Sequence, residues 1–248
     1  MKRRKAMILG ILGCALSVPL KALDHVYSKG LAKEVIEEKR EDYGKVQAEL
    51  ESYRLAMLKK FQLAQASDKK ELLVKVRQRL ERDLRREMFP AWYGTVWDFN
   101  GTSKTPGEGK IACGYFVSTC LTHLGFKVSR IKLAQQPSQR IIETFMAKSD
   151  RKILAGGKSM EVIRAYLKSQ GDGIHIVGLD SHVGFISVEG DDMAFIHSSY
   201  YRPGAVVKAE PIDTRNPLSD SKYRVFGKIF SDEMLTHWLQ GKTYQVKT

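Results

Sequence analysis

Apolar residues recur at helical spacing in the first part of the chain. Within residues 33–66 they follow one another at intervals of three or four positions: Tyr43, Val46, Leu50, Tyr53, Met57 and Phe61. Such intervals place side chains along one face of an α-helix, and charged residues occupy most of the remaining positions. A second helix is expected up to residue 88, with Asp68 and Glu71 as a start that resembles a capping box and Pro90 as its end.

Two such helices in succession predict an antiparallel hairpin over residues 23–89. The apolar stripe along it has to be covered, because apolar surface is unfavourable in water. The main domain, the hairpin itself or a second copy of the chain could cover it. Self-association through the 33–88 helices is therefore one of three open alternatives.

After residue 90 the pattern changes to loops, one apolar helix and short apolar segments joined by Asp/Gly turns. Five of these segments predict strands, at residues 174–179, 182–189, 193–200, 206–212 and 224–230. The polar region 127–170 before them predicts two helices, near 137–148 and 158–169. One helix followed by an antiparallel sheet is an α+β arrangement. We expect it to span residues 90–248, with 127–170 as an insertion.

The N-terminus has the pattern of an export signal. A cluster of basic residues at positions 2–5 precedes an apolar run over residues 6–18, which is too short to span a bilayer comfortably. We therefore expect residues 1–22 to be a signal peptide and the mature protein to be periplasmic or secreted. Two alternatives stay open: an uncleaved anchor, and a lipoprotein signal in which Cys14 is acylated and holds the protein at the membrane.

Charge and composition exclude few classes of protein. The formal charge of +13 falls to +8 without residues 1–22, and the basic residues are not clustered with aromatic ones. This distribution argues against a nucleic-acid partner and suits a protein that works near an anionic cell envelope. The spacing of His, Cys, Asp and Glu suggests no set of metal ligands, so we expect no metal and no other cofactor.

Cys113 begins the apolar helix directly after a Pro/Gly-rich loop at residues 106–109. The free N–H groups and partial positive charge of a helix N-terminus favour a thiolate, which is the nucleophilic form of cysteine. A small buried cysteine would give the same pattern. Cys120 lies about 10 Å further along the helix, beyond disulfide reach, so we expect the Cys113 thiol to be free.

A thiol nucleophile needs a base, and usually a third group that orients the base. His182 and His197 lie on successive predicted strands, whose pairing would place the two imidazoles side by side. Two half-buried strand histidines without a catalytic role would show the same pattern. The remaining histidines are less suitable: His25, His123, His175 and His237. Of these, His123 lies about 15 Å along the same helix as Cys113 and is out of reach.

Taken in order, these motifs resemble the NlpC-type cell-wall peptidases. The matching stretches are Gly94-Thr95-Val96-Trp97-Asp98-Phe99-Asn100-Gly101, the 106–109 loop, Ala112-Cys113-Gly114-Tyr115-Phe116-Val117, Gly171-Asp172, His182-Val183-Gly184-Phe185 and Ile196-His197-Ser198-Ser199. Members of this family are small papain-like cysteine hydrolases that cut peptidoglycan stem peptides. The resemblance implies a papain-like fold with Cys113 as nucleophile, His182 as base and His197 as the group that orients His182.

The resemblance also implies where the substrate binds. Trp97 takes the position of a tyrosine near the oxyanion, where its indole N–H and the backbone N–H of Cys113 would donate. Four more residues are expected to line the oxyanion and substrate pocket: Asn100, Gly114, Tyr115 and Ser181. Two departures from the family stand beside the nucleophile, Ala112 in place of an aspartate and Gly114-Tyr115 in place of Ser-Gly. Because these positions shape recognition of the stem peptide's amine in the family, we expect an altered specificity.

The sequence as a whole predicts an exported cysteine hydrolase that cleaves a peptide or amide bond in peptidoglycan stem peptides. One alternative is the same fold acting as an amidase or acyltransferase on another amide-containing substrate. The other is a cell-envelope binding module without turnover, in which the helical hairpin would supply the functional surface.

Overall fold

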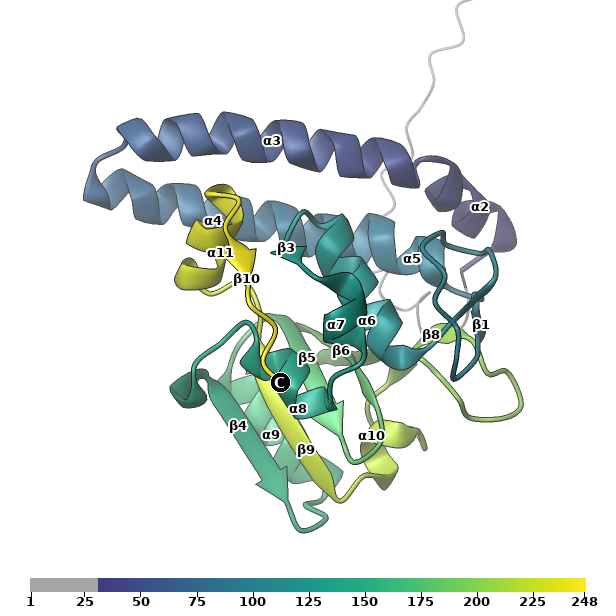
Figure 1. Cartoon of the computed structure of the whole chain (residues 1–248). Helices are drawn as coiled ribbons and strands as arrows, with labels where there is room; N and C mark the ends of the chain where they lie inside the picture. The colour runs from purple at the N-terminus through teal and green to yellow at the C-terminus, as the bar shows by residue number, and fades with distance from the viewer. Residues whose placement is uncertain (1–30) are drawn as a thin grey trace, which may run out of the picture.

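The computed structural model describes residues 31–248 as a mixed α+β protein (Figure 1). The predicted signal peptide and Cys14 lie outside these residues. Within 31–248, no helix has both the length and the apolar character needed to cross a membrane.

One six-stranded antiparallel sheet forms the centre of the molecule, with strand order β4-β9-β5-β6-β7-β8. Its strands are β4 (Arg151–Ala155), β5 (Gly173–Leu179), β6 (Val183–Glu189), β7 (Asp192–Ser198), β8 (Val207–Pro211) and β9 (Tyr223–Lys228). Five of them agree with the predicted strands to within two residues at either end. The sixth, β4, lies at the sheet edge inside the 127–170 region, where only helices had been expected. Its side chains are half-buried or exposed, so no apolar alternation marked it.

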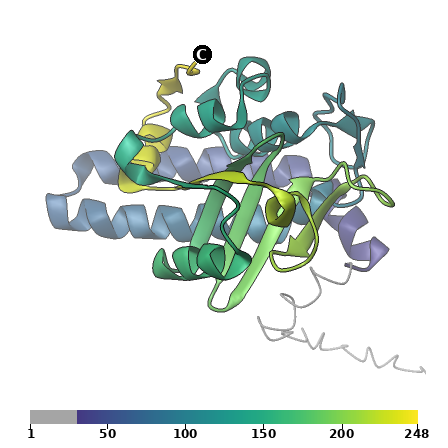
Figure 2. The same cartoon turned by 90° about the horizontal axis from the view of Figure 1, so that it is seen from below.

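The hairpin consists of α2 (Lys33–Glu41), α3 (Tyr43–Leu63) and α4 (Ala66–Asp83), and Figure 2 shows it lying across the sheet. Along the predicted stripe Tyr43, Leu50 and Met57 are buried, and they belong to the same core as the residues of the main domain. Of the three alternatives for covering the stripe, the described chain uses two, because α3 packs on α4 of the same hairpin and on α11 (Asp232–Leu239) of the main domain. Self-association through these helices stays a prediction.

Both predicted boundaries of the second helix were wrong. The helix α4 begins at Ala66, before the expected capping box, and its N-cap Gln65 makes no side-chain hydrogen bond. At the other end Pro90 does not stop the helical path, which passes through a π-helical turn, Leu84–Met88, into the short helix α5, Phe89–Trp92. The wider turn accommodates a proline that cannot donate a backbone hydrogen bond and would crowd the preceding turn.

Aromatic side chains join the short helix α5 that follows the hairpin, the helix α6 (Cys113–His123) and the sheet. The helix α6 packs on β6 and β7. The rings of Phe89, Phe116 and Phe185, one from each part, contact one another with centroids 5.0 to 6.2 Å apart. Such buried aromatic clusters bury a large apolar area. The start of α6 is therefore held at a fixed place above the sheet.

Shorter elements complete the fold. They are the parallel pairs β1 (Val96–Trp97) with β2 (Lys110–Ile111) and β3 (Lys127–Val128) with β10 (Thr243–Tyr244), and the helices α7 (Arg130–Ala134), α8 (Ser138–Glu143), α9 (Met160–Ser169), α10 (Pro217–Asp220) and α11 (Asp232–Leu239), with a 3-10 turn at Lys148–Asp150. The first predicted insertion helix is shorter than expected, and the second agrees with α9. On the sheet face away from α6, α9 and α10 cover a second apolar core.

Candidate active site

Cys113 is the first residue of α6 and is half-buried. Ala112 before it is extended, and its N–H donates to the carbonyl of Gly101 at 2.9 Å, which ties the preceding loop to the helix start. Burial raises the pKa of the Cys113 thiol above its ordinary value, although hydrogen bonds from the backbone N–H groups of Val183, Gly114 and Cys113 lower it in part. The resting thiol is therefore protonated at neutral pH, and a base is needed to activate it.

His182 and His197 lie side by side. His182 precedes β6 and His197 is on β7; Nε2 of His182 and Nδ1 of His197 are 2.8 Å apart, and their rings are nearly perpendicular. Both side chains are buried. A Cβ on Gly184 would lie 2.8 Å from the Cβ of His197 and 2.7 Å from the ring of Phe195, closer than real contacts allow. The glycine in the His-Val-Gly-Phe stretch is therefore what lets the two strands bring these rings together.

The proposed base has one free nitrogen. Nδ1 of His182 is buried and has no hydrogen-bond partner among residues 31–248. Burial, and then the proximity of His197, lowers the pKa of His182 well below its ordinary value, so the imidazole is neutral. The next residue, Val183, donates its backbone N–H to the Cys113 sulfur. The Cys113 sulfur is therefore tied to the start of β6, one residue after His182.

The sequence did not single out Glu210, which hydrogen-bonds to the far side of His197. Nε2 of His197 is 2.8 Å from Oε1 of Glu210, and Nζ of Lys208 is 3.0 Å from the other carboxylate oxygen. The β7–β8 register explains this arrangement, because Glu210 pairs with Phe195 and Lys208 with His197. Directly paired residues point to the same sheet face. A register is a tertiary property, so the sequence carried no direct signal of this contact.

Aromatic rings form a wall beside His182. The ring centroids of Tyr200 and His182 are 5.2 Å apart, and those of Trp97 and Tyr200 are 5.9 Å apart. Tyr201 continues the wall at 5.0 Å from Tyr200, and its hydroxyl donates to Asp220 at 2.8 Å. Trp97 thus lies near the histidine pair, and Tyr200, which the sequence reasoning did not select, lies between them.

The other predicted pocket residues have different surroundings. Gly114 faces the insertion, since a Cβ there would be 2.3 Å from the carbonyl oxygen of Ala134. The guanidinium of Arg130 lies 4.9 Å from the centroid of the Tyr115 ring. Asn100 and Ser181 are exposed. Helix α7 therefore covers the side of the nucleophile helix on which Gly114 and Tyr115 lie.

Neither of the remaining core histidines belongs to this cluster. Nδ1 of His123 is 3.2 Å from the hydroxyl of Tyr43, at the contact between α6 and the hairpin. His175 is buried on β5, and neither of its ring nitrogens has a hydrogen-bond partner in the part of the chain that the structure describes. Cys120 is buried and free. Residues 31–248 contain no group of three or more His, Cys, Asp or Glu side chains placed to hold a metal ion.

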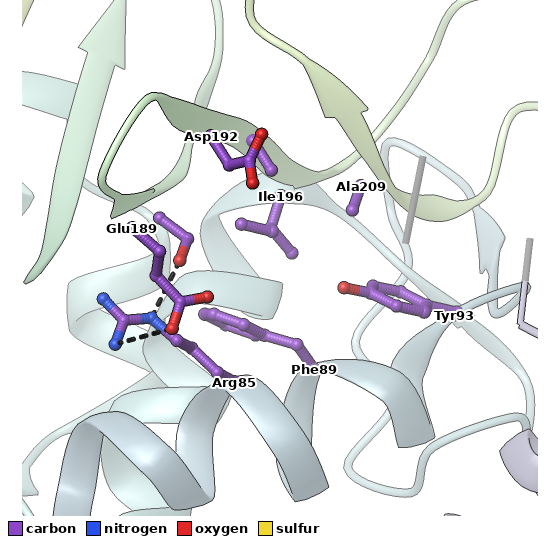
Figure 3. A pocket seen from close by; sticks show the side chains of 9 residues that line it. Arg85, Phe89, Tyr93, Glu189, Asp192, Ile196 and Ala209 are labelled. Atoms are coloured by element: carbon purple, nitrogen blue, oxygen red, sulfur yellow. Dashed lines mark hydrogen bonds and ion pairs between the residues drawn. The ribbon is translucent and has the colours of Figure 1, made fainter. Parts of the chain in front are cut away.

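A separate small cavity of about 50 Å³, open to solvent, lies beside strands β7 and β8 (Figure 3). It is lined by Arg85, Phe89, Tyr93, Ser187, Glu189, Asp192, Ala194, Ile196 and Ala209. Ile196 and Ala209 are paired in the β7–β8 ladder, so their side chains point away from those of the neighbouring His197 and Glu210. The cavity therefore lies on the sheet face on which α6 packs, opposite the side chains of His197 and Glu210.

Comparisons with protein-family models, with curated proteins and with solved structures find no match to this chain. The functional argument therefore depends on the geometry of Cys113, His182 and His197 and on the motifs around them.

Proposed function

We propose that this protein is an exported cysteine hydrolase with a papain-like, NlpC-type fold that cleaves an amide bond in peptidoglycan stem peptides. The observation that carries the proposal is the free Nδ1 of His182, whose Nε2 is hydrogen-bonded to His197 and whose neighbour Val183 contacts the Cys113 sulfur. A nucleophile at a helix N-terminus, a base and an orienting group are the three parts that thiol catalysis needs.

The proposed reaction begins when Nδ1 of His182 takes the proton of the Cys113 thiol. The sulfur attacks the amide carbon and forms a C–S bond, and the oxyanion accepts hydrogen bonds from the backbone N–H of Cys113 and the indole N–H of Trp97. The C–N bond then breaks, and the amine leaves with the proton held by His182. Water gives a proton to His182 and attacks the thioester, which releases the acid and restores the thiol.

The proton is transferred during the attack and not before it. The pKa of the Cys113 thiol is raised and that of His182 is lowered, in each case mainly by burial, so the neutral pair is favoured over a thiolate–imidazolium pair. A neutral base keeps its lone pair below the ordinary pKa of histidine, about 6.5. We therefore expect the acidic limb of the activity profile to lie below that pH.

The second candidate function is an amidase or acyltransferase on an amide other than the stem peptide. Two observations favour it: no carboxylate stands at Ala112, and the carbonyl of Ala134 fills the space over Gly114. The site would keep its chemistry while the insertion changes what it binds. The third alternative, a binding module without turnover, requires function to survive the loss of Cys113.

Alkylation of the thiol tests the Cys113–His182 pair. Iodoacetamide is added to the full chain and to His182→Ala between pH 5 and 9, and peptide mapping separates Cys113 from Cys120. We expect Cys113 to react faster in the intact chain than in the variant near pH 7, because only the intact chain has the base. Cys120, which is fully buried, is the internal control. Equal, slow rates at Cys113 in both proteins would argue for the binding module.

Digestion of purified cell-wall fragments tests the substrate. The intact chain and Cys120→Ala should release new amino groups from the stem peptides, whereas Cys113→Ala should not. If the intact chain hydrolyses other amides but digests no cell walls, and Cys113→Ala loses that activity, the second candidate function is selected.

A further inference from the structure

We infer that Glu210, which is ion-paired with Lys208, is a positioning residue: through His197 it fixes which ring nitrogen of His182 carries the proton. The catalytic consequence of this inference depends on the proposed function, but the arrangement of protons does not. It rests on the chain of contacts from Lys208 to the free nitrogen of His182.

The direction of each hydrogen bond follows from the one before it. An ionised carboxylate only accepts hydrogen bonds, so the 2.8 Å contact with Glu210 requires a proton on Nε2 of His197. A neutral imidazole has one N–H, which leaves Nδ1 of His197 as an acceptor. The 2.8 Å contact with His182 then requires a proton on Nε2 of His182. Its Nδ1 must therefore carry the lone pair, and this is the buried atom without a partner.

These proton positions require a neutral His197, and its burial favours that state, with a smaller contribution from Lys208. A protonated His197 would donate from both nitrogens, so Nε2 of His182 would have to accept and Nδ1 would carry the proton. That arrangement removes the base. Burial lowers the pKa of His197, the carboxylate of Glu210 raises it and Lys208 lowers it, and the net shift is downward. The carboxyl of Glu210 itself keeps a lowered pKa despite its burial, because both His197 and Lys208 bind it.

In the described part of the chain, four titratable groups surround the histidine pair, two on the side of His197 and two on the side of His182. Glu210 and Lys208 face His197 from β8, and the ring of Phe195 stacks on His197 with centroids 4.1 Å apart. On the other side, Tyr200 and the Cys113 neighbourhood face His182. The contacts that begin at Lys208 therefore end at Nε2 of His182, whose Nδ1 is the nitrogen without a partner.

The strand β8 is well placed to keep these groups in register. Beyond its pairing with β7, the N–H of Val207 donates to Thr95 at 2.8 Å, and its carbonyl accepts from Gly94 at 2.9 Å. The hydroxyl of Ser198 on β7 donates to the carbonyl of Ile111 at 2.7 Å. The strand β8, which carries Glu210, is thus also hydrogen-bonded to the segment that leads to Trp97. The strand β7, which carries His197, is bonded to Ile111, just before Cys113.

Nitrogen-15 NMR of the imidazoles in the full chain tests the inference without any substrate, after assignment by single His→Gln variants. At pH 7 we expect His182 with Nε2 protonated and Nδ1 unprotonated. Glu210→Leu should give mixed tautomers, whereas Glu210→Gln, whose amide oxygen can still accept, should keep the native one. Lys208→Met should raise the pH at which His197 becomes protonated. Asp192→Asn, an exposed carboxylate at the start of β7, is the control and should change nothing.

Two results would overturn the inference: a native tautomer in Glu210→Leu, or Nδ1-protonated His182 in the intact chain. Backbone amide spectra identify a variant that has not folded, and Glu210→Gln then remains informative. If the chain has amidase activity, Glu210→Leu should lower kcat by at least about tenfold with little change in KM. Native tautomers without hydrolysis would reject the proposed function and leave the positioning role intact.

Discussion

At the scale of single residues, the candidate site depends on small differences in what each side chain can donate or accept. Among the histidines that the structure describes, His182 has a buried ring with one nitrogen bound to His197 and the other without a partner, and the next residue, Val183, donates to the Cys113 sulfur. His175 is equally buried, yet neither of its nitrogens is bound, so nothing orients it. A general base needs one ring nitrogen that is hydrogen-bonded, so that the ring is oriented, and one that is free to accept a proton; His175 lacks the first.

Gly184 is the residue whose replacement tests this packing most directly. We expect Gly184→Ala to lower the free energy of unfolding by roughly 1–3 kcal/mol and to slow Cys113 alkylation, since the new Cβ would press on Phe195 and His197. Urea unfolding and the alkylation rate measure the two effects. The control is Gly44→Ala in α3, where a Cβ meets nothing within 4 Å. If Gly184→Ala were as harmless as the control, the close approach of the strands would not matter for the site.

At the scale of elements, the hairpin is bound to the segment between Tyr93 and Gly107, which contains Trp97, as well as to the core. Arg40 of α2 donates to the carbonyls of Ala91 at 3.1 Å and Tyr93 at 2.9 Å, and its guanidinium occupies the space beside Gly107. These contacts fix both ends of the segment that contains Trp97. At the other end of the molecule, Arg54 of α3 donates to the carbonyl of Leu239 in α11 at 2.9 Å.

The loop contact leads to a prediction for Arg40→Ala. We expect a loss of about 1–3 kcal/mol in the free energy of unfolding, because two backbone carbonyls lose a charged donor. We also expect a slower Cys113 alkylation as the Trp97 segment loosens. Lys39→Ala is the matched control: it breaks the 2.7 Å ion pair with Glu87 between helices but does not touch the loop. Equal effects of both substitutions on alkylation would refute a specific role of Arg40.

The predicted elements differ from the observed ones where tertiary contacts decide. The region 127–170 is polar, and the edge strand β4 within it exists because β9 offers an unpaired edge. Likewise α11 is held by Trp238, whose indole N–H donates to the carbonyl of Leu124 at 2.8 Å. The strand β4 has no apolar alternation of its own, whereas α11 has a local signal that was not used: Ser231 caps it, and its buried apolar residues recur at helical spacing.

At the scale of the whole molecule, buried neutral histidines link stability to pH. Burial, with smaller contributions from nearby cations, lowers the pKa of His123 to about 4 and of His175 to about 3. His182 and His197 are shifted in the same direction. In the unfolded chain these histidines would be protonated near the ordinary pKa of about 6.5, whereas in the folded chain they are protonated only at lower pH.

This shift predicts destabilisation by mild acid. A histidine with a lowered pKa in the folded state favours unfolding as the pH falls below the unfolded value, and its effect becomes constant only below the folded pKa. Between pH 7 and 4.5, His175 alone should account for a loss of about 2–3 kcal/mol. Urea unfolding of the intact chain and of His175→Leu at both pH values measures this. A variant that loses as much stability as the intact chain would show that His175 is not responsible.

The sequence alone determined the features that depend on neighbours along the chain. The spacing of apolar residues and the turn residues identified the helical hairpin and five of the six strands of the central sheet. The loop-to-helix junction identified Cys113 as the nucleophile candidate. The two strand histidines could be named because they stand near the ends of successive strands. Local steric and hydrophobic preferences are sufficient for these inferences.

Only the tertiary structure decided which of the named residues meet, and in what geometry. Glu210 and Tyr200 were not selected, since their contacts with His197 and His182 depend on strand register and on the path of the chain after β7. The occupied space over Gly114 depends on how α7 packs, as does the contact of Tyr115 with Arg130. Register and packing are settled by the whole core at once, because a shift of a single position would turn every side chain of a strand to the other face.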